Sequence, residues 1–164
     1  LWTVSNELEK LKLFANGAPV SKAMIDAICT PSLVSSIFKL TDSIAQKDLK
    51  QSLKTFEILR ESGEDLIRIF FMIARHFRIL IQVHEMLEKK ESSFSITKKL
   101  KQHPFVIQKT SSQSKNFSRE KLKNIHEKLL EIDTKTKTGI IKSFKTDNRE
   151  FELAVEKLII DCCK

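Results

Sequence analysis

The chain has 164 residues, which is enough for one ordinary domain or for one domain with a small appendage. Its apolar share of 41% and charged share of 30% exclude a disordered tail. Only three glycines and three prolines occur, so a β-rich fold with many tight turns is disfavoured and helices are favoured. The net charge of +8 leaves a phosphate-bearing partner open.

The first elements in chain order are two short helices. The apolar spacing predicts one from Ser5, a good N-cap, to Asn16-Gly17, which can end it. Ser21 starts the second. Thr30-Pro31-Ser32 then breaks the pattern, because the residue before a proline is disfavoured in a helix. We therefore expect a domain boundary here, with a small piece over 1–30 and the main domain over 34–164.

The main domain opens with three helices. The first keeps helical spacing from Leu33 to Gln46, and Asp48 caps the second, which ends at Ser62-Gly63. The third starts near Glu64-Asp65 and reaches about Lys90. It is apolar over most of its circumference, which predicts a helix packed on several sides at the centre of a bundle.

The rest of the chain continues the helical pattern. We expect Ser95 to cap a short basic helix through Lys101, and Pro104 to stand in the first turn of another. Residues 111–116 are polar and predict a loop. Ser118 caps a long helix that Gly139 ends. Residues 147–150 have the spacing of a capping box for a last helix that reaches about Cys162.

The elements together predict an all-α fold. Its main part is a bundle of about five to six helices, and a two-helix piece precedes it.

Catalytic and ligand motifs are missing from the sequence. It contains no phosphate-binding loop, no dinucleotide-binding fingerprint and no paired-histidine zinc motif. His76 and His84 lie eight residues apart, which is the wrong spacing for two ligands on adjacent turns. Cys162 and Cys163 lie beside Asp161 at the expected end of a helix and are expected to be inert thiols. We therefore predict no catalytic residues, no metal and no cofactor.

The basic charge belongs mainly to one segment. Residues 97–145 hold 13 basic and 4 acidic side chains, a net of +9. Lys98, Lys99 and Lys101 are candidate phosphate contacts, so a stand-alone basic helical nucleic-acid-binding domain is an alternative function. Aromatic side chains for stacking are sparse, and a solvated lysine face explains the same charge.

Five stretches of the chain carry a family resemblance when they are read in order. They are Asn6-Glu7-Leu8-Glu9-Lys10-Leu11, Ile37-Phe38-Lys39-Leu40, Ala74-Arg75-His76-Phe77-Arg78-Ile79-Leu80, His103-Pro104-Phe105-Val106, and Asp133 followed by Lys137-Thr138-Gly139. In order and spacing they resemble the delta subunit of the bacterial DNA polymerase III clamp loader over nearly the whole chain.

The resemblance implies a protein that looks like an AAA+ ATPase subunit without nucleotide binding. Residues 1–30 would be the end of its lid domain, and 34–164 its collar. The collar of such proteins joins other loader subunits, of the gamma/tau and delta-prime types, in a pentameric ring. An N-terminal domain grips and opens the sliding clamp. That domain is expected to be absent here, because the chain begins at Leu1-Trp2-Thr3 without an initiator Met and looks like a fragment.

The implied function is non-catalytic assembly within a DNA-directed DNA polymerase holoenzyme, a nucleotidyltransferase complex, during replication. We expect a bacterial cytoplasmic location, because the sequence has no signal peptide and no apolar run of 18 residues, and we expect no membrane contact. A collar must offer surface to two neighbours, so Arg75, Phe77 and Arg78 are candidate interface residues. Internal ion pairs of the two arginines with Asp42 or Glu57 are the alternative.

Overall fold

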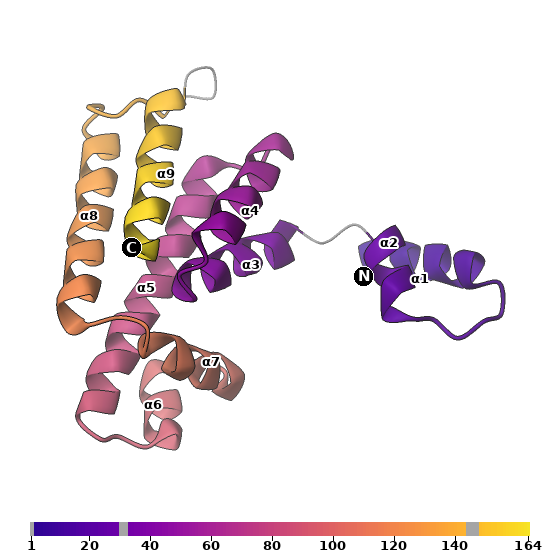
Figure 1. Ribbon diagram of the computed structural model, residues 1–164, viewed down its shortest axis with the longest axis horizontal. Helices are drawn as coiled ribbons and strands as arrows, with labels where there is room; N and C mark the ends of the chain where they lie inside the picture. Colours follow the sequence, from indigo (N-terminus) through magenta and orange to yellow (C-terminus); the bar gives the residue numbers. More distant parts are fainter. Residues whose placement is uncertain (1, 30–32, 144–147) are drawn as a thin grey trace. The chain divides into compact units, whose positions relative to one another are not determined.

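The computed structural model describes residues 2–29, 33–143 and 148–164. Every regular element in these ranges is a helix, which confirms the predicted all-α class (Figure 1). The chain divides into two compact units, 1–35 and 36–164. The predicted break at Thr30-Pro31-Ser32 lies outside the described residues.

The first unit is a helical hairpin. It consists of α1 (Trp2–Ala15) and α2 (Lys22–Ile28). The Ser21 hydroxyl accepts a hydrogen bond from the Met24 N–H at 3.3 Å, so the predicted cap of α2 is confirmed. Asn16 and Gly17 both take positive φ angles, 41° and 84°, and end α1 as expected.

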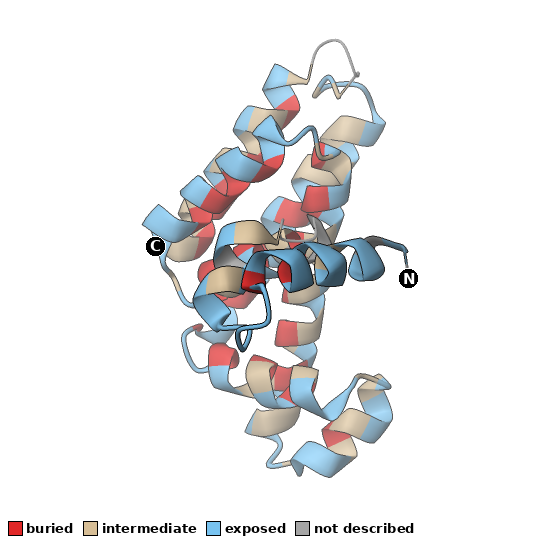
Figure 2. Ribbon diagram, turned by 90° about the vertical axis from the view of Figure 1, so that its right-hand side faces the viewer, coloured by how far each residue is buried: buried red, intermediate tan, exposed pale blue. Residues whose placement is uncertain are grey.

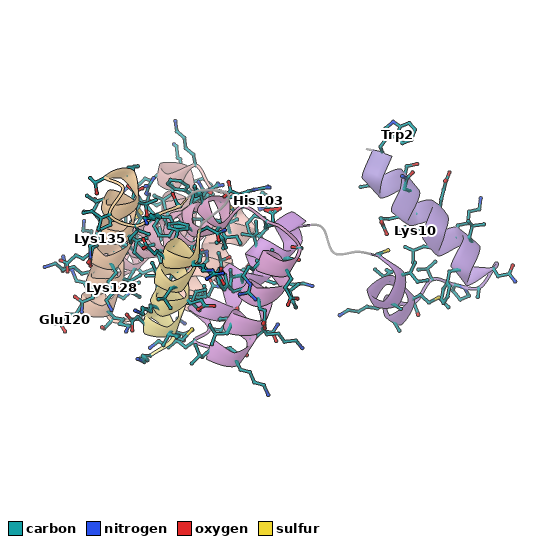
Figure 3. The ribbon with its side chains drawn as sticks, turned by 90° about the horizontal axis from the view of Figure 1, so that it is seen from above. Trp2, Lys10, His103, Glu120, Lys128 and Lys135 are labelled. Atoms are coloured by element: carbon teal, nitrogen blue, oxygen red, sulfur yellow. The ribbon has the colours of Figure 1, made fainter. Side chains whose placement is uncertain are left out.

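The predicted start of α1 at Ser5 is wrong. The helix begins at Trp2, and Ser5 lies exposed within it. The free N–H groups at an exposed helix start can bind water as well as a serine hydroxyl. A good capping residue therefore does not by itself determine where a helix begins. Trp2 is 85% exposed and projects from the beginning of α1 (Figure 3).

The second unit holds seven helices in its described residues, one more than the predicted range. They are α3 (Leu33–Ala45), α4 (Leu49–Glu61), α5 (Leu66–Glu88), α6 (Ser93–Leu100), α7 (Pro104–Ser114), α8 (Arg119–Lys137) and α9 (Arg149–Cys163). The long α5 runs through the unit. It packs against α8 and α9 on one side and against α6 and α7 toward its C-terminal end (Figure 1).

The main core of this unit lies along the predicted apolar stripe of α5. Its buried members on α5 are Leu66, Ile69, Phe70, Ile73, Phe77 and Leu80. Phe70 meets Phe151 of α9 edge to face, with ring centroids 5.6 Å apart. Figure 2 shows the buried residues on the inward faces of the helices. The prediction of α5 as the central helix is confirmed.

A smaller core lies beyond the main one. Val83 of α5, Ile96 of α6 and Ile107 of α7 are buried together, and Ile79 packs against them. The short helices α6 and α7 therefore fold onto the second half of α5. Because α5 takes part in both cores, this helix needs an apolar surface wider than one face.

The side-chain caps of the longer helices follow the prediction. The Asp48 and Asp65 carboxylates accept from Gln51 and Ile67 N–H groups at 3.0 Å, and Ser118 accepts from Lys121 at 3.1 Å. These bonds satisfy helix N–H groups that have no partner inside the helix.

Three local predictions are wrong. Ser92, not Ser95, caps α6, because its hydroxyl accepts from the Ser95 N–H. Residues 111–116 are not a loop, since α7 continues to Ser114. Thr110, Gln113 and Ser114 are buried there, so tertiary packing outweighs the polar composition.

The capping box at 147–150 is also wrong where it can be judged. Asp147 lies outside the described residues, and Asn148 caps α9 without a side-chain bond. The Glu150 carboxylate accepts instead from the Lys142 N–H at 3.0 Å.

Candidate functional site

A groove of about 430 Å³ opens between α3, α5 and α7. Met72 and Ile79 of α5 and Val106 of α7 line it and are partly buried. Phe38 of α3 and Phe105 of α7 line it as well, although they are 51% and 63% exposed. Exposed aromatic rings in one concave surface are typical of a contact site rather than of a closed core.

A polar bridge holds α3 and α7 together at this groove. The Asp42 carboxylate accepts from Lys109 Nζ at 2.5 Å and from Gln113 Nε2 at 3.1 Å. Asn116 Nδ2 donates to the Ala45 carbonyl at 2.9 Å. These contacts join segments about 70 residues apart. They fix the spacing of the two helices even where a partly exposed ion pair adds little stability.

His76 of α5 is the titratable group buried in the groove wall. Neither its Nε2 nor the nearby Gln113 Oε1 has a hydrogen-bond partner among the described residues. Burial lowers the pKa of His76 from 6.5 to about 4; Lys109 acts in the same direction, and Asp42 and Gln113 oppose it. The imidazole is therefore neutral at pH 7.

Arg75, a predicted interface residue, lines the same groove. It is exposed, and the described part of the chain offers it no ion pair. Asp42 is held by Lys109, and Glu57 lies 3.8 Å from Arg60. The alternative of internal pairs for Arg75 and Arg78 is therefore wrong within the described residues, and both guanidinium groups face solvent.

Phe77, the other predicted interface residue, is a core side chain. It is 1% exposed, and its ring meets Phe117 nearly at a right angle, with centroids 5.7 Å apart. A side chain in this position cannot reach a neighbouring protein. The candidate surface therefore keeps Arg75 and Arg78 and leaves out Phe77, whose place in the apolar stripe of α5 already indicated the core.

The candidate phosphate contacts Lys98, Lys99 and Lys101 lie at the end of α6. Lys99 Nζ donates to both Glu91 carboxylate oxygens, at 2.8 and 2.7 Å, and this pair lowers the pKa of Glu91. Lys98 and Lys101 are exposed, and no acidic side chain of the described residues pairs with them. The structure thus leaves two of the three lysines available.

The basic segment as a whole is partly neutralised by the fold. Within the described part of the segment, six lysines form ion pairs, and they are Lys99, Lys109, Lys123, Lys128, Lys135 and Lys137. Three of their acidic partners, Glu91, Asp42 and Asp161, lie outside the segment. Lys128 and Lys135 project from α8 (Figure 3). This distribution favours a solvated lysine face over one continuous cationic surface.

The cysteines sit where their thiols are poor nucleophiles. Burial raises the pKa of Cys162 and of Cys163, so the thiolate is disfavoured in both. Among the described residues no three histidine, cysteine or acidic side chains gather as metal ligands would. Within the same ranges no helix is long and apolar enough to cross a membrane.

The groove itself was not predicted. Phe38 and Asp42 are four residues apart on α3, and Phe105, Lys109 and Gln113 repeat every four on α7. Such spacing places each set on one helix face, so the signal was present in the sequence. It was hidden because 111–116 was interpreted as a loop, which removed the second half of α7.

Comparisons with known proteins give one consistent result. The model of the family described as "DNA polymerase III delta subunit, C-terminal domain" matches residues 34–162. The DNA polymerase III subunit delta of Bacillus subtilis (strain 168) is 29% identical over 140 residues, which are 85% of this chain and 40% of that protein.

A solved structure agrees with the sequence matches. The Bacillus subtilis DNA clamp loader delta protein is similar at a TM-score of 0.72 and 27% identity, covering 97% of this chain and 46% of that one. The chain thus spans less than half the length of both relatives. Because the family match extends over most of the chain, including all the helices that surround the groove, the chain belongs to the DNA polymerase III delta subunit family, in the region of its C-terminal domain.

Proposed function

We propose that this chain is a non-catalytic assembly module of a bacterial clamp loader. The unit over 36–164 would be its collar and would bind loader subunits of the gamma/tau and delta-prime types. The family match over 34–162 carries this proposal. The exposed side chains of Arg75, Phe38 and Phe105 around one groove support it, because a module that binds other proteins must present such mixed surface.

The proposal extends to the rest of the protein. Residues 1–30 would be the end of an AAA+-like lid domain, and a further N-terminal domain would contact the sliding clamp. The assembled loader would place that clamp on DNA during replication in the bacterial cytoplasm. The polymerase chemistry, a nucleotidyl transfer, would belong to other subunits of the holoenzyme.

Co-elution of the chain with purified gamma/tau-type and delta-prime-type subunits tests the assembly role. We expect a stable complex on size exclusion at micromolar concentration. Separate elution of all components at that concentration would refute the proposal.

Nucleic-acid binding is the second candidate function, and the available charges of Lys98 and Lys101 are the observation in its favour. Fluorescence anisotropy with duplex DNA across a salt series tests it. Each phosphate contact contributes a slope of about −0.9 to the dependence of log affinity on log salt concentration. A slope near zero would rule out a phosphate-binding role.

A further inference from the structure

The groove between α3, α5 and α7 exposes apolar surface that its own unit does not cover. Phe38 and Phe105 leave more than half of their surfaces in water, and the partly buried Met72, Ile79 and Val106 line the same groove. Removing such surface from water is favourable by about 25 cal/mol per Å². A volume of about 430 Å³ has room for a large aliphatic or aromatic side chain from another molecule.

The walls of this groove are held in place before anything binds. Asp42 is bonded to Lys109 and Gln113, and Asn116 to the Ala45 carbonyl, so α3 cannot move away from α7 without breaking three polar contacts on one edge. A preorganised groove loses little conformational entropy on binding. This property suits a contact between folded proteins.

The charges at the groove select for an acidic partner. The single carboxylate in its lining, Asp42, is neutralised by Lys109, and His76 is uncharged at pH 7. Arg75 remains as an exposed cation without an acidic partner in the described residues. A guanidinium group can bind a carboxylate through two parallel hydrogen bonds, which fixes both position and orientation.

The shape of the groove favours a helix as the bound element. The described lining residues lie on α3, α5 and α7, except for Gln102 just before α7, and none of them belongs to a strand edge that could accept a β-strand. Grooves between helices accept the apolar ridge of another helix, anchored by side chains three and four residues apart.

We propose that this groove binds an acidic amphipathic helix of a neighbouring subunit. A large apolar side chain of that helix inserts between Phe38 and Phe105, and a glutamate or aspartate one turn away pairs with Arg75. This inference rests on the proposed assembly role and names the surface that performs it and the chemistry of the partner.

The test measures the affinity of the full chain for the purified loader subunits by surface plasmon resonance. Arg75→Glu and Phe105→Ala are the groove variants, and both change exposed side chains. Lys54→Glu on α4 and Phe94→Ala on α6 are matched controls, since Lys54 is an exposed lysine without an ion pair in the described residues and Phe94 is 81% exposed. Circular dichroism confirms that all four variants fold.

We expect each groove variant to weaken binding at least about tenfold, the range of an interface hot spot, and each control to change it less than about twofold. Arg75→Lys keeps the charge and should bind more tightly than Arg75→Glu. Wild-type affinity in both groove variants would overturn the groove proposal while leaving the assembly role intact. No binding by the wild-type chain would overturn the assembly role itself.

Two further outcomes would also overturn the groove proposal. Sedimentation of the chain alone that shows a dimer, lost in Phe105→Ala, would mean that a second copy fills the groove and would overturn the proposed partner. Equal loss of affinity in groove and control variants would show that the contact is spread over the unit rather than seated in this groove.

Discussion

The buried imidazole of His76 makes the stability of the fold depend on pH in a defined window. The unfolded chain takes up a proton at this residue near its ordinary pKa of 6.5, whereas the folded protein takes it up only near 4. Between these values the unfolded state binds more protons, so the free energy of unfolding falls as pH falls. The slope is about 1.4 kcal/mol per pH unit, which gives a loss of about 3 kcal/mol across the window.

The assay compares wild type with His76→Gln by urea unfolding at a series of pH values. The difference between the two free energies of unfolding isolates the histidine, because Asp42, Lys109 and Gln113 face the ring and remain in both proteins. We expect this difference to be constant above pH 6.5 and to shift by about 3 kcal/mol in favour of the variant by pH 4. Below pH 4 the folded imidazole is protonated too, and the difference levels off.

A flat difference between wild type and variant from pH 7 to pH 4 would refute the reasoning. It would mean that the folded protein accepts the proton as readily as the unfolded chain. Either water reaches the ring, or Asp42 compensates the full cost of burying the charge.

Three other substitutions test the packing and the polar contacts. Phe77→Ala should lower the free energy of unfolding by about 3–5 kcal/mol in urea titrations, because it empties a core position, whereas Phe94→Ala should stay within about 0.5 kcal/mol; equal effects would contradict the burial pattern. Ser118→Ala should increase fraying of α8 and lower the free energy of unfolding by about 1 kcal/mol, because it removes the cap of that helix. Ser5 lies inside α1, so Ser5→Ala should leave the stability nearly unchanged, and thermal melts of the two variants measure the difference. Asp42→Ala should speed amide hydrogen exchange in α3 by releasing it from α7, and an unchanged exchange rate would show that the apolar contacts alone hold the helix.

The helices of the second unit could be read from the sequence because their signals agree with one another. The apolar stripe of α5 coincides with its acidic start at Asp65, and Ser118 and Pro104 stand at the positions that helix geometry requires of them. Where the apolar pattern, the capping residue and the helix-ending residue all indicate the same helix, tertiary packing agrees with the local preference of the chain.

Sequence patterns do not predict a helix whose formation depends on packing against other parts of the chain. The second half of α7 is polar, yet Thr110, Gln113 and Ser114 are buried against neighbouring helices, a fact that no local pattern contains. The groove could not be predicted either, because the second half of α7 forms part of one of its walls. Phe77 is a different case. We expected it at the subunit interface, although the helical period of the apolar residues on α5 indicates a core position, and the structure buries it.

The bridge from Asp42 to Lys109 has a consequence for the order in which the unit assembles. Sixty-seven residues separate its ends, so the chain must close a long loop before this wall of the groove exists. Helices α5, α6 and α7 are closer neighbours in sequence and can pack first, leaving α3 to dock late and to open early. A partner seated across both walls would then bind only the docked form, and at a hundred times its dissociation constant it would stabilise that form by about 2.7 kcal/mol. Assembly into a complex would thereby oppose the opening of a groove that is already formed before the partner binds.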